Sequence, residues 1–122
     1  MARAYSAFAE GGADLGVTPE TLARITAPPA PHLAVSKDEV LGVPTYFSLG
    51  FLRPGPDVAF GSTERAFGAP GAGGSFAFAD PDARLGYAYV MNKLNFYLSD
   101  DPREKALRDA ICRAIARLSQ GA

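Results

Sequence analysis

The sequence predicts an α+β fold, in which a three-stranded antiparallel sheet carries N-terminal helices and a C-terminal helix packed on the sheet. The observations behind it are helical apolar spacing at the start, a central stretch rich in aromatic and β-forming residues, and a strongly capped helix at the end. A chain of 122 residues is long enough for one core and too short for two ordinary domains. We therefore expect a helical segment (1–27), a linker (28–44), the sheet (45–93) and the C-terminal helix (101–119).

The N-terminal segment predicts two short helices. Apolar residues recur at helical spacing from residue 4 to residue 9, and a pair of glycines ends the run. A second helix is expected from Thr18, because threonine can cap it, Pro19 has no N–H to lose, and Glu20 suits the positive helix end. The prolines at the start of the linker end this helix and predict an extended connection.

Three segments in the middle of the chain predict strands. Residues 45–52 alternate along the chain and are rich in aromatic and β-forming types, and residues 73–79 and 86–92 form two further runs. The connection 80–84 is short, so the second and third strands should pair as an antiparallel hairpin. We expect this connection to be solvated and the aromatic side chains to form the core.

The C-terminal helix has the clearest signals. Asp101 is a capping residue, Pro102 fits the first helical position, and Glu104 stands at the capping-box position. Five apolar residues then recur on one helical face, and that face is expected to bury against the aromatic sheet. Its members are Leu107, Ile111, Ala114, Ile115 and Leu118.

Composition and charge argue against several classes of function. The formal net charge is −1, and the 12 basic and 13 acidic residues are spread along the chain, so no nucleic-acid partner is expected. No apolar run reaches the ~20 residues of a membrane span and the start does not resemble a signal peptide, so we expect a cytoplasmic protein without a membrane partner. Cys112 is expected to be structural and His32 to lie in a loop, so neither a metal nor a cofactor is predicted.

The segment 67–75, Phe-Gly-Ala-Pro-Gly-Ala-Gly-Gly-Ser, is the most unusual part of the sequence. Its glycines let the backbone approach a ligand and adopt φ values closed to other residues. A phosphate loop would need a Gly-Lys-Ser/Thr ending, and a nucleophile elbow around Ser75 would need a glycine where Ala77 stands. The residue types alone therefore predict a glycine-rich loop that opens a strand, with Glu64 and Arg65 as candidates for substrate contact at a cleft rim.

Five stretches together resemble a known family. They are Leu-Gly-Val-Pro at 41–44, Phe-Ser-Leu-Gly-Phe at 47–51, the glycine-rich segment 67–75, Phe-Ala-Asp-Pro at 78–81 and Tyr-Ala-Tyr-Val-Met-Asn at 87–92. In this order they resemble the C-terminal third of class-C-like β-lactamase-related serine hydrolases, which include esterases and share the fold of penicillin-binding proteins. The resemblance implies a partial β-lactamase/transpeptidase-like fold.

Members of that family place three motifs around one pocket. Ser-x-x-Lys supplies a nucleophile and its activating lysine, Tyr-x-Asn or Ser-x-Asn lies on a loop, and Lys/His-x-Gly lies on a strand beside the cleft. The resemblance places the third motif at Ala69, Pro70 and Gly71, which match a His-Pro-Gly form except that Ala69 replaces the basic residue. It also implies that the backbone N–H of Ala72 is an oxyanion-hole donor.

The other two motifs are absent from these 122 residues. No lysine has a serine three places before it, and no tyrosine or serine has an asparagine two places after it. The predicted function is therefore a C-terminal part of a β-lactamase-like hydrolase whose parent catalyses acyl transfer, with no activity of this chain alone. Two alternatives stay open: half of an enzyme completed in trans by an upstream hydrolase segment, and a non-enzymatic module that self-associates through a sheet edge.

Overall fold

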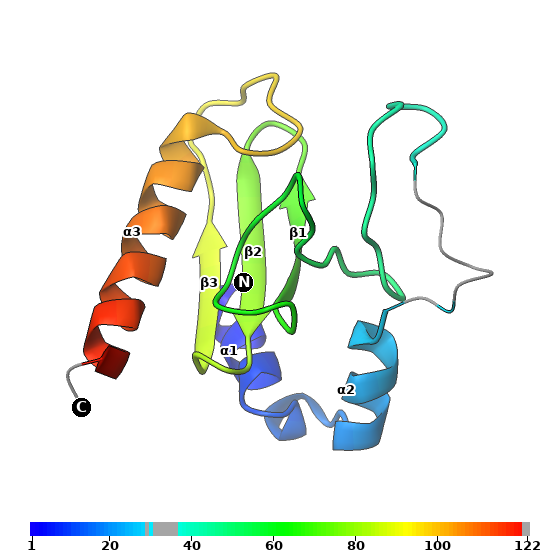
Figure 1. The fold of residues 1–122 in the computed structure, drawn as a ribbon, viewed down its shortest axis with the longest axis vertical. Coiled ribbons are helices and arrows are strands. Elements are labelled where there is room, and N and C mark those ends of the chain that lie inside the picture. The colour runs from blue at the N-terminus through cyan, green and yellow to red at the C-terminus, as the bar shows by residue number, and fades with distance from the viewer. Residues whose placement is uncertain (29, 31–36, 121–122) are drawn as a thin grey trace.

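The computed structural model describes residues 1–28, 30 and 37–120, so His32 lies outside the described residues. Within this part of the chain, three α-helices, one short 3₁₀ helix and a three-stranded antiparallel sheet form an α+β arrangement, as predicted (Figure 1). None of the described helices is long and apolar enough to cross a membrane. The elements are α1 (Ala2–Ala9), η1 (Ala13–Leu15), α2 (Pro19–Thr26), β1 (Phe67–Gly71), β2 (Ser75–Asp80), β3 (Leu85–Tyr89) and α3 (Pro102–Gln120).

The N-terminal helices form where local signals predicted them. The backbone N–H of Thr21 donates to Thr18 Oγ1 at 3.2 Å, so the predicted threonine cap of α2 is confirmed. Gly12 has a φ of 82°, a left-handed value that favours glycine and lets the chain turn between α1 and η1. The start of α2 and the turn after α1 thus follow from local capping and glycine chemistry.

The first strand of the sheet differs from the one that the sequence predicted. Residues 45–52 do not form a strand of the sheet; they fold back on themselves, with the Ser48 N–H donating to the Phe51 carbonyl at 2.8 Å and Gly50 at a φ of 96°. Only Leu52 reaches the sheet, through two backbone hydrogen bonds with Gly68 at 2.7 and 2.9 Å. Strand propensity indicates that a segment fits a pleated surface, but it does not identify the strand with which the segment pairs. The aromatic run at 45–52 therefore could not show that the glycine-rich segment forms the first strand of the sheet.

The sheet has the order β1-β2-β3, and all its pairs are antiparallel. Residues 72–74 join β1 to β2 and residues 81–84 join β2 to β3, so the predicted hairpin is present. Gly68 must be a glycine, because a Cβ there would overlap the carbonyl oxygen of Ala77 on the neighbouring strand. A segment of small residues can therefore lie closer to β2 than an aromatic run could.

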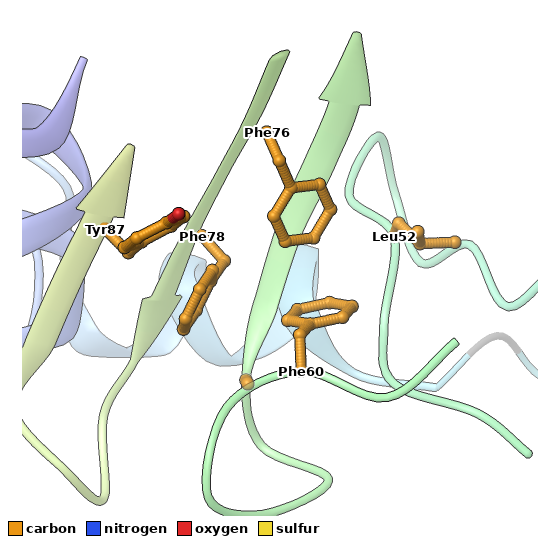
Figure 2. Packing of buried hydrophobic residues seen from close by; sticks show 6 residues of the cluster. Leu52, Phe60, Phe76, Phe78 and Tyr87 are labelled. Atoms are coloured by element: carbon orange, nitrogen blue, oxygen red, sulfur yellow. The ribbon is translucent and has the colours of Figure 1, made fainter. Parts of the chain in front are cut away.

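Each face of the sheet carries its own apolar cluster. On the face that meets α3, Leu52, Phe60, Phe76, Phe78 and Tyr87 form the larger cluster, in which the Phe60 and Phe76 rings pack edge to face with centroids 5.1 Å apart (Figure 2). On the face that meets α1, Ala9, Phe67 and Ala79 form the smaller cluster. The predicted aromatic core is thus present on both faces.

Helix α3 packs beside the sheet with a different side inward than the sequence predicted. Leu107 and Leu118 are 55% and 75% exposed, whereas Glu104 and Arg108 are each 2% exposed. Of the predicted apolar face, Ile111 packs against the larger cluster. The helix is oriented by its buried arginine, whose guanidinium donates to the Ala59 carbonyl, and this contact outweighs the burial of the two leucines.

Candidate functional site

The structure places Ala69, Pro70 and Gly71 on an edge strand. They pair with Ala77, Phe76 and Ser75 of β2, and in an antiparallel pair the backbone groups of alternate residues point to opposite sides. Because Gly68 bonds outward to Leu52, Pro70 turns its backbone to the same outer edge. Proline has no N–H to donate, and an edge position tolerates this. Among the described residues, no strand pairs with β1 on this outer edge, and Leu52 bridges it at Gly68.

Ala72 lies at the end of this edge, in the turn between β1 and β2. The N–H of Gly74 donates to the Gly71 carbonyl at 3.1 Å, and Gly73 and Gly74 have φ values of 94° and 108°. These positive values explain the glycine pair, because other residues rarely adopt them. The turn fixes the direction of the Ala72 peptide, which is the requirement for the oxyanion-hole role that the family resemblance predicts for its N–H.

The turn is supported by the segment that leads into α3. The Asn95 N–H donates to the Gly73 carbonyl at 3.0 Å, and a Cβ on Gly74 would overlap the carboxylate of Asp101. Asp101 also caps α3, because the Arg103 N–H donates to its Oδ1 at 3.0 Å. Hydrogen bonds from the Arg103 side chain lower the pKa of Asp101, which stays ionised beside the turn. The helix start and the turn thus hold each other in place.

A small crevice lies beside the third-motif position, and its side chains show what the arrangement can do. Pro70, Gly71 and Ser75 form one wall, and residues 97–101 with Glu104 form the other. The Ser75 hydroxyl points across the hairpin at Gly71, since a Cβ there would overlap its Oγ. Ser75 opens a strand rather than a helix, so it is not on a nucleophile elbow. The described residues at this crevice provide backbone groups and a concave surface, but no activated nucleophile.

A buried ion network behind this crevice was missed by sequence reasoning. Arg108 Nε lies 3.1 Å from Glu104 Oε1, the same guanidinium donates to Asp100, and it stacks over the Phe76 ring with 5.0 Å from Cζ to the centroid. Burial raises the pKa of Glu104, and burial together with the nearby Glu104 raises the pKa of Tyr87. The only sequence signal was the i, i+4 spacing of Glu104 and Arg108. The network joins α3 to the crevice wall.

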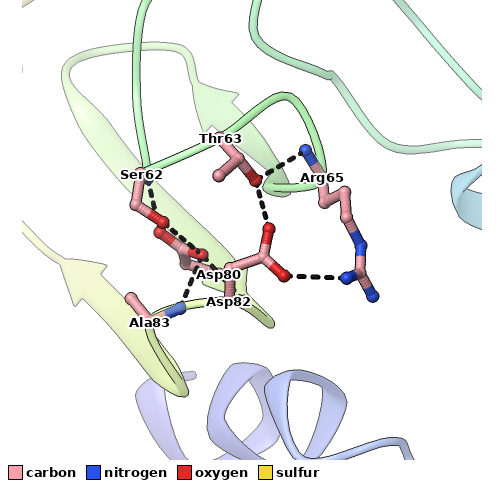
Figure 3. A network of polar contacts seen from close by, with 6 residues as sticks. All are labelled: Ser62, Thr63, Arg65, Asp80, Asp82 and Ala83. Carbon is pink, nitrogen blue, oxygen red and sulfur yellow. Dashed lines mark hydrogen bonds and ion pairs between the residues drawn. The ribbon is translucent and has the colours of Figure 1, made fainter.

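The other predicted candidates lie elsewhere. Arg65 pairs with Asp82 at 2.8 Å, next to the β2–β3 turn and at the opposite end of β1 from Gly71 (Figure 3). Asp80, expected in a solvated connection, is 1% exposed and accepts hydrogen bonds from Ser62 and from the N–H groups of Asp82 and Ala83. Arg65 therefore does not join the third-motif position, and Asp80 organises a turn.

Cys112 and the metal-ligating residue types add nothing to this site. Cys112 lies inside α3 and is partly buried, and burial raises the pKa of its thiol, which disfavours the reactive thiolate. Among residues 1–28, 30 and 37–120, no group of three or more His, Cys, Asp or Glu side chains is arranged to hold a metal ion. The candidate site is thus the β1 edge with its turn.

Comparison with solved structures finds three similar proteins. The chain superposes on a family VIII carboxylesterase with a TM-score of 0.79 and 36% sequence identity, covering 93% of this chain and 30% of that one. It superposes on a penicillin-binding protein homologue from Caulobacter crescentus with a TM-score of 0.72 and 39% identity, covering 84% of this chain and 27% of that one. No protein-family model matches the sequence, and no curated protein matches it.

A third solved structure agrees with the first two. EstA from Arthrobacter nitroguajacolicus Rue61a matches with a TM-score of 0.71 and 31% identity, over 84% of this chain and 26% of that one. The chain therefore spans less than a third of the length of each of these relatives. With identity of 31–39% over most of these residues, the chain resembles one part of the domain of these β-lactamase/penicillin-binding-protein-like serine hydrolases in both sequence and fold.

Proposed function

We propose that these residues form the cleft-lining sheet edge of an esterase-type serine hydrolase, whose nucleophile and activating base come from the rest of the domain. The observation that carries this proposal is the outer edge of β1 at Pro70, followed by the hydrogen-bonded turn that contains Ala72. Fixed backbone N–H groups at such a place stabilise the negative oxygen that develops during acyl transfer, and removing one such donor costs about 10²–10³-fold in rate. The likeness to a carboxylesterase supports an ester as the substrate class.

The same proposal holds that the 122 residues alone do not hydrolyse esters. The methyl group of Ala69 neither carries charge nor moves a proton, and the sequence contains no Ser-x-x-Lys. A positioned general base contributes about 10²–10⁴-fold and a covalent nucleophile opens the two-step route, so backbone donors by themselves provide little catalysis.

An active-site serine phosphonylating probe tests this proposal. The intact mass of the chain is expected to stay unchanged after incubation, because no described serine is activated. One covalent adduct on the chain would contradict the proposal, and Ser75→Ala would then show whether Ser75 carries it. With an intact serine hydrolase of the family as the positive control, the mass increase confirms that the probe is reactive.

A further inference from the structure

The start of α3 carries a buried carboxylate that contacts the turn between β1 and β2. The side chain of Asp101 is only 2% exposed, and its carboxylate leaves no room for a Cβ on Gly74. The Arg103 guanidinium donates to both carboxylate oxygens, at 2.9 Å from Nε to Oδ1 and 2.6 Å from a terminal nitrogen to Oδ2. This bidentate pair fixes the orientation of the carboxylate against the turn.

The same guanidinium also holds the loop that follows β3. Its other terminal nitrogen donates to the Lys93 carbonyl at 3.0 Å. Two residues later, the Asn95 N–H donates to the Gly73 carbonyl at 3.0 Å, so the loop is also bound to the turn directly. The loop, the turn and the start of α3 lie at one end of the sheet (Figure 1). Asp101 and Arg103, which we call the α3 clamp, therefore join three separate segments.

The α3 clamp lies beside the peptide on which the proposed function depends. Ala72 stands between Gly71, whose carbonyl accepts from the Gly74 N–H, and Gly73, whose carbonyl accepts from Asn95. Glycines have the freest backbone of all residues, so a turn built from them is not rigid by itself. An oxyanion-hole donor must keep its direction, and a misplacement of about 1 Å can cost about 10²-fold in rate. The turn therefore needs contacts from outside the hairpin, and the α3 clamp supplies them.

The charge of the α3 clamp also suits this place. An unpaired carboxylate beside the turn would repel the negative oxygen that develops during acyl transfer. Arg103 neutralises the carboxylate of Asp101, and a lysine would not reproduce its planar arrangement of donors. Ala69 brings no positive charge to the third-motif position, so that motif cannot offset the charge of Asp101.

We propose that Asp101 and Arg103 are positioning residues for the acyl transfer, which hold the Ala72 N–H in the direction that the oxyanion requires. They act through the backbone of the turn and not on the substrate. The inference rests on the proposed function, but the order of the turn can be measured without any catalysis.

Backbone order parameters from nitrogen-15 relaxation of the chain test whether the α3 clamp orders the turn. The Ala72 amide is expected at about 0.85, typical of a rigid backbone, and below about 0.6 in Asp101→Ala and in Arg103→Ala, while the amides of β2 stay rigid. Asp109→Ala removes an exposed ion pair from the same helix and is the matched control, without effect on the turn. Arg103→Lys, a milder change that keeps the charge, should give an intermediate value.

A chimera tests the effect on chemistry: this chain replaces the matching part of the family VIII carboxylesterase, and the rate of labelling by the phosphonylating probe is measured. Asp101→Ala and Arg103→Ala are expected to lower the maximal rate at least about tenfold. The probe concentration that gives half of the maximal rate should change less than about twofold, because binding of the probe is not disturbed. Arg103→Lys should recover part of the rate, and Asp109→Ala should change neither value.

Three results would overturn the proposal. The first is an Ala72 amide that stays rigid, or a maximal rate that stays unchanged, in the alanine variants. The second is an effect mainly on the half-maximal probe concentration, which would mean that Arg103 binds the substrate directly. The third is a loss of order in β2 as well as in the turn, even in Arg103→Lys, which would give the pair a general structural role. A chimera that is not labelled even without a substitution would contradict the proposed function, and the order parameters would still decide whether the α3 clamp orders the turn.

Discussion

Helices α1 and α3 are held against the sheet in different ways. Helix α1 lies directly on β3, where a Cβ on Gly86 would overlap the Ser6 backbone, and its Phe8 ring packs edge to face on Phe67 at 6.0 Å. Helix α3 is oriented by the buried Arg108 and turns Leu107 to solvent. Apolar packing thus sets the position of α1, whereas a buried charge network sets the orientation of α3.

This difference teaches what an apolar helical pattern means in a part of a domain. The apolar side chains of α1 pack against other side chains of the same chain: Ala9 is buried in the smaller cluster, and Tyr5 and Phe8 pack against it. The pattern of α3 was equally clear in the sequence, yet its leucines have no cover among the described residues. Periodicity identifies an apolar side, but the surface that covers it is a property of the whole domain.

Breaking the network of α3 is expected to have the largest effect. Arg108→Ala should lower the free energy of unfolding by about 3–5 kcal/mol, because Glu104 is left buried without its partner. Urea unfolding followed by circular dichroism measures this change. Lys105→Ala removes the exposed pair with Asp109 on the same helix and should cost no more than about 0.5 kcal/mol. Similar costs for both variants would show that the buried network does not hold α3.

Disturbing the contact of α1 comes next. Gly86→Val should cost about 1–3 kcal/mol, because the added side chain overlaps the backbone of α1 and the helix must move. Val90→Ala, at an exposed position just after the same strand, is the matched control and should change stability by less than about 0.5 kcal/mol. If Gly86→Val had an effect as small as the control, α1 would not lie on β3 in solution.

Two truncations on α3 compare a partly buried position with an exposed one, a turn apart on the helix. Ile111→Ala should cost about 1–2 kcal/mol, below the range of fully buried residues because Ile111 is only partly buried. Leu107→Ala should cost less than about 0.5 kcal/mol in the isolated chain, because its side chain is already 55% exposed. Chemical unfolding of both variants under one condition checks the order, and a larger cost at Leu107 would mean that the leucine side faces the sheet.

The pH dependence at the start of α3 is expected to be the smallest effect. Hydrogen bonds from Arg103 lower the pKa of Asp101 in the folded chain, so its contribution to stability is present above the unfolded pKa of about 3.9 and is lost as pH falls through the lower folded value. Asp101→Asn should therefore flatten the acid side of a plot of unfolding free energy against pH. An unchanged acid slope in this variant would show that Asp101 is not paired in solution.

Local signals predicted much of the fold. The elements that depend on pairing between distant segments could not be predicted. Thr18 and Asp101 cap the helices that they were expected to cap, and the short connection 80–84 forms the expected hairpin. The first strand was placed at 45–52, because aromatic residues have the stronger strand propensity. The glycine-rich segment takes that place instead, since its lack of side chains allows close approach to β2.

The candidate site shows the same division. The positions of Ala69, Pro70 and Gly71 in the motif came from family resemblance, and the chain topology then put them on an open edge beside Ala72. The supporting contacts of Asp101 with the glycine turn could not be predicted, because they join residues that are far apart in the sequence. Arg65, although close to the segment along the chain, lies at the other end of the strand.

By itself, the sequence determined the class of the fold, the helix ends, the β2–β3 hairpin and the likeness to a serine hydrolase, because each depends on neighbouring residues or on a stretch with a characteristic order. Only the tertiary structure decided which segment forms β1, which side of α3 turns inward and which edges stay open. The orientation of α3 depends on satisfying a buried guanidinium, and the choice of β1 depends on the close approach to β2 that Gly68 allows. Both are contacts between distant parts of the chain.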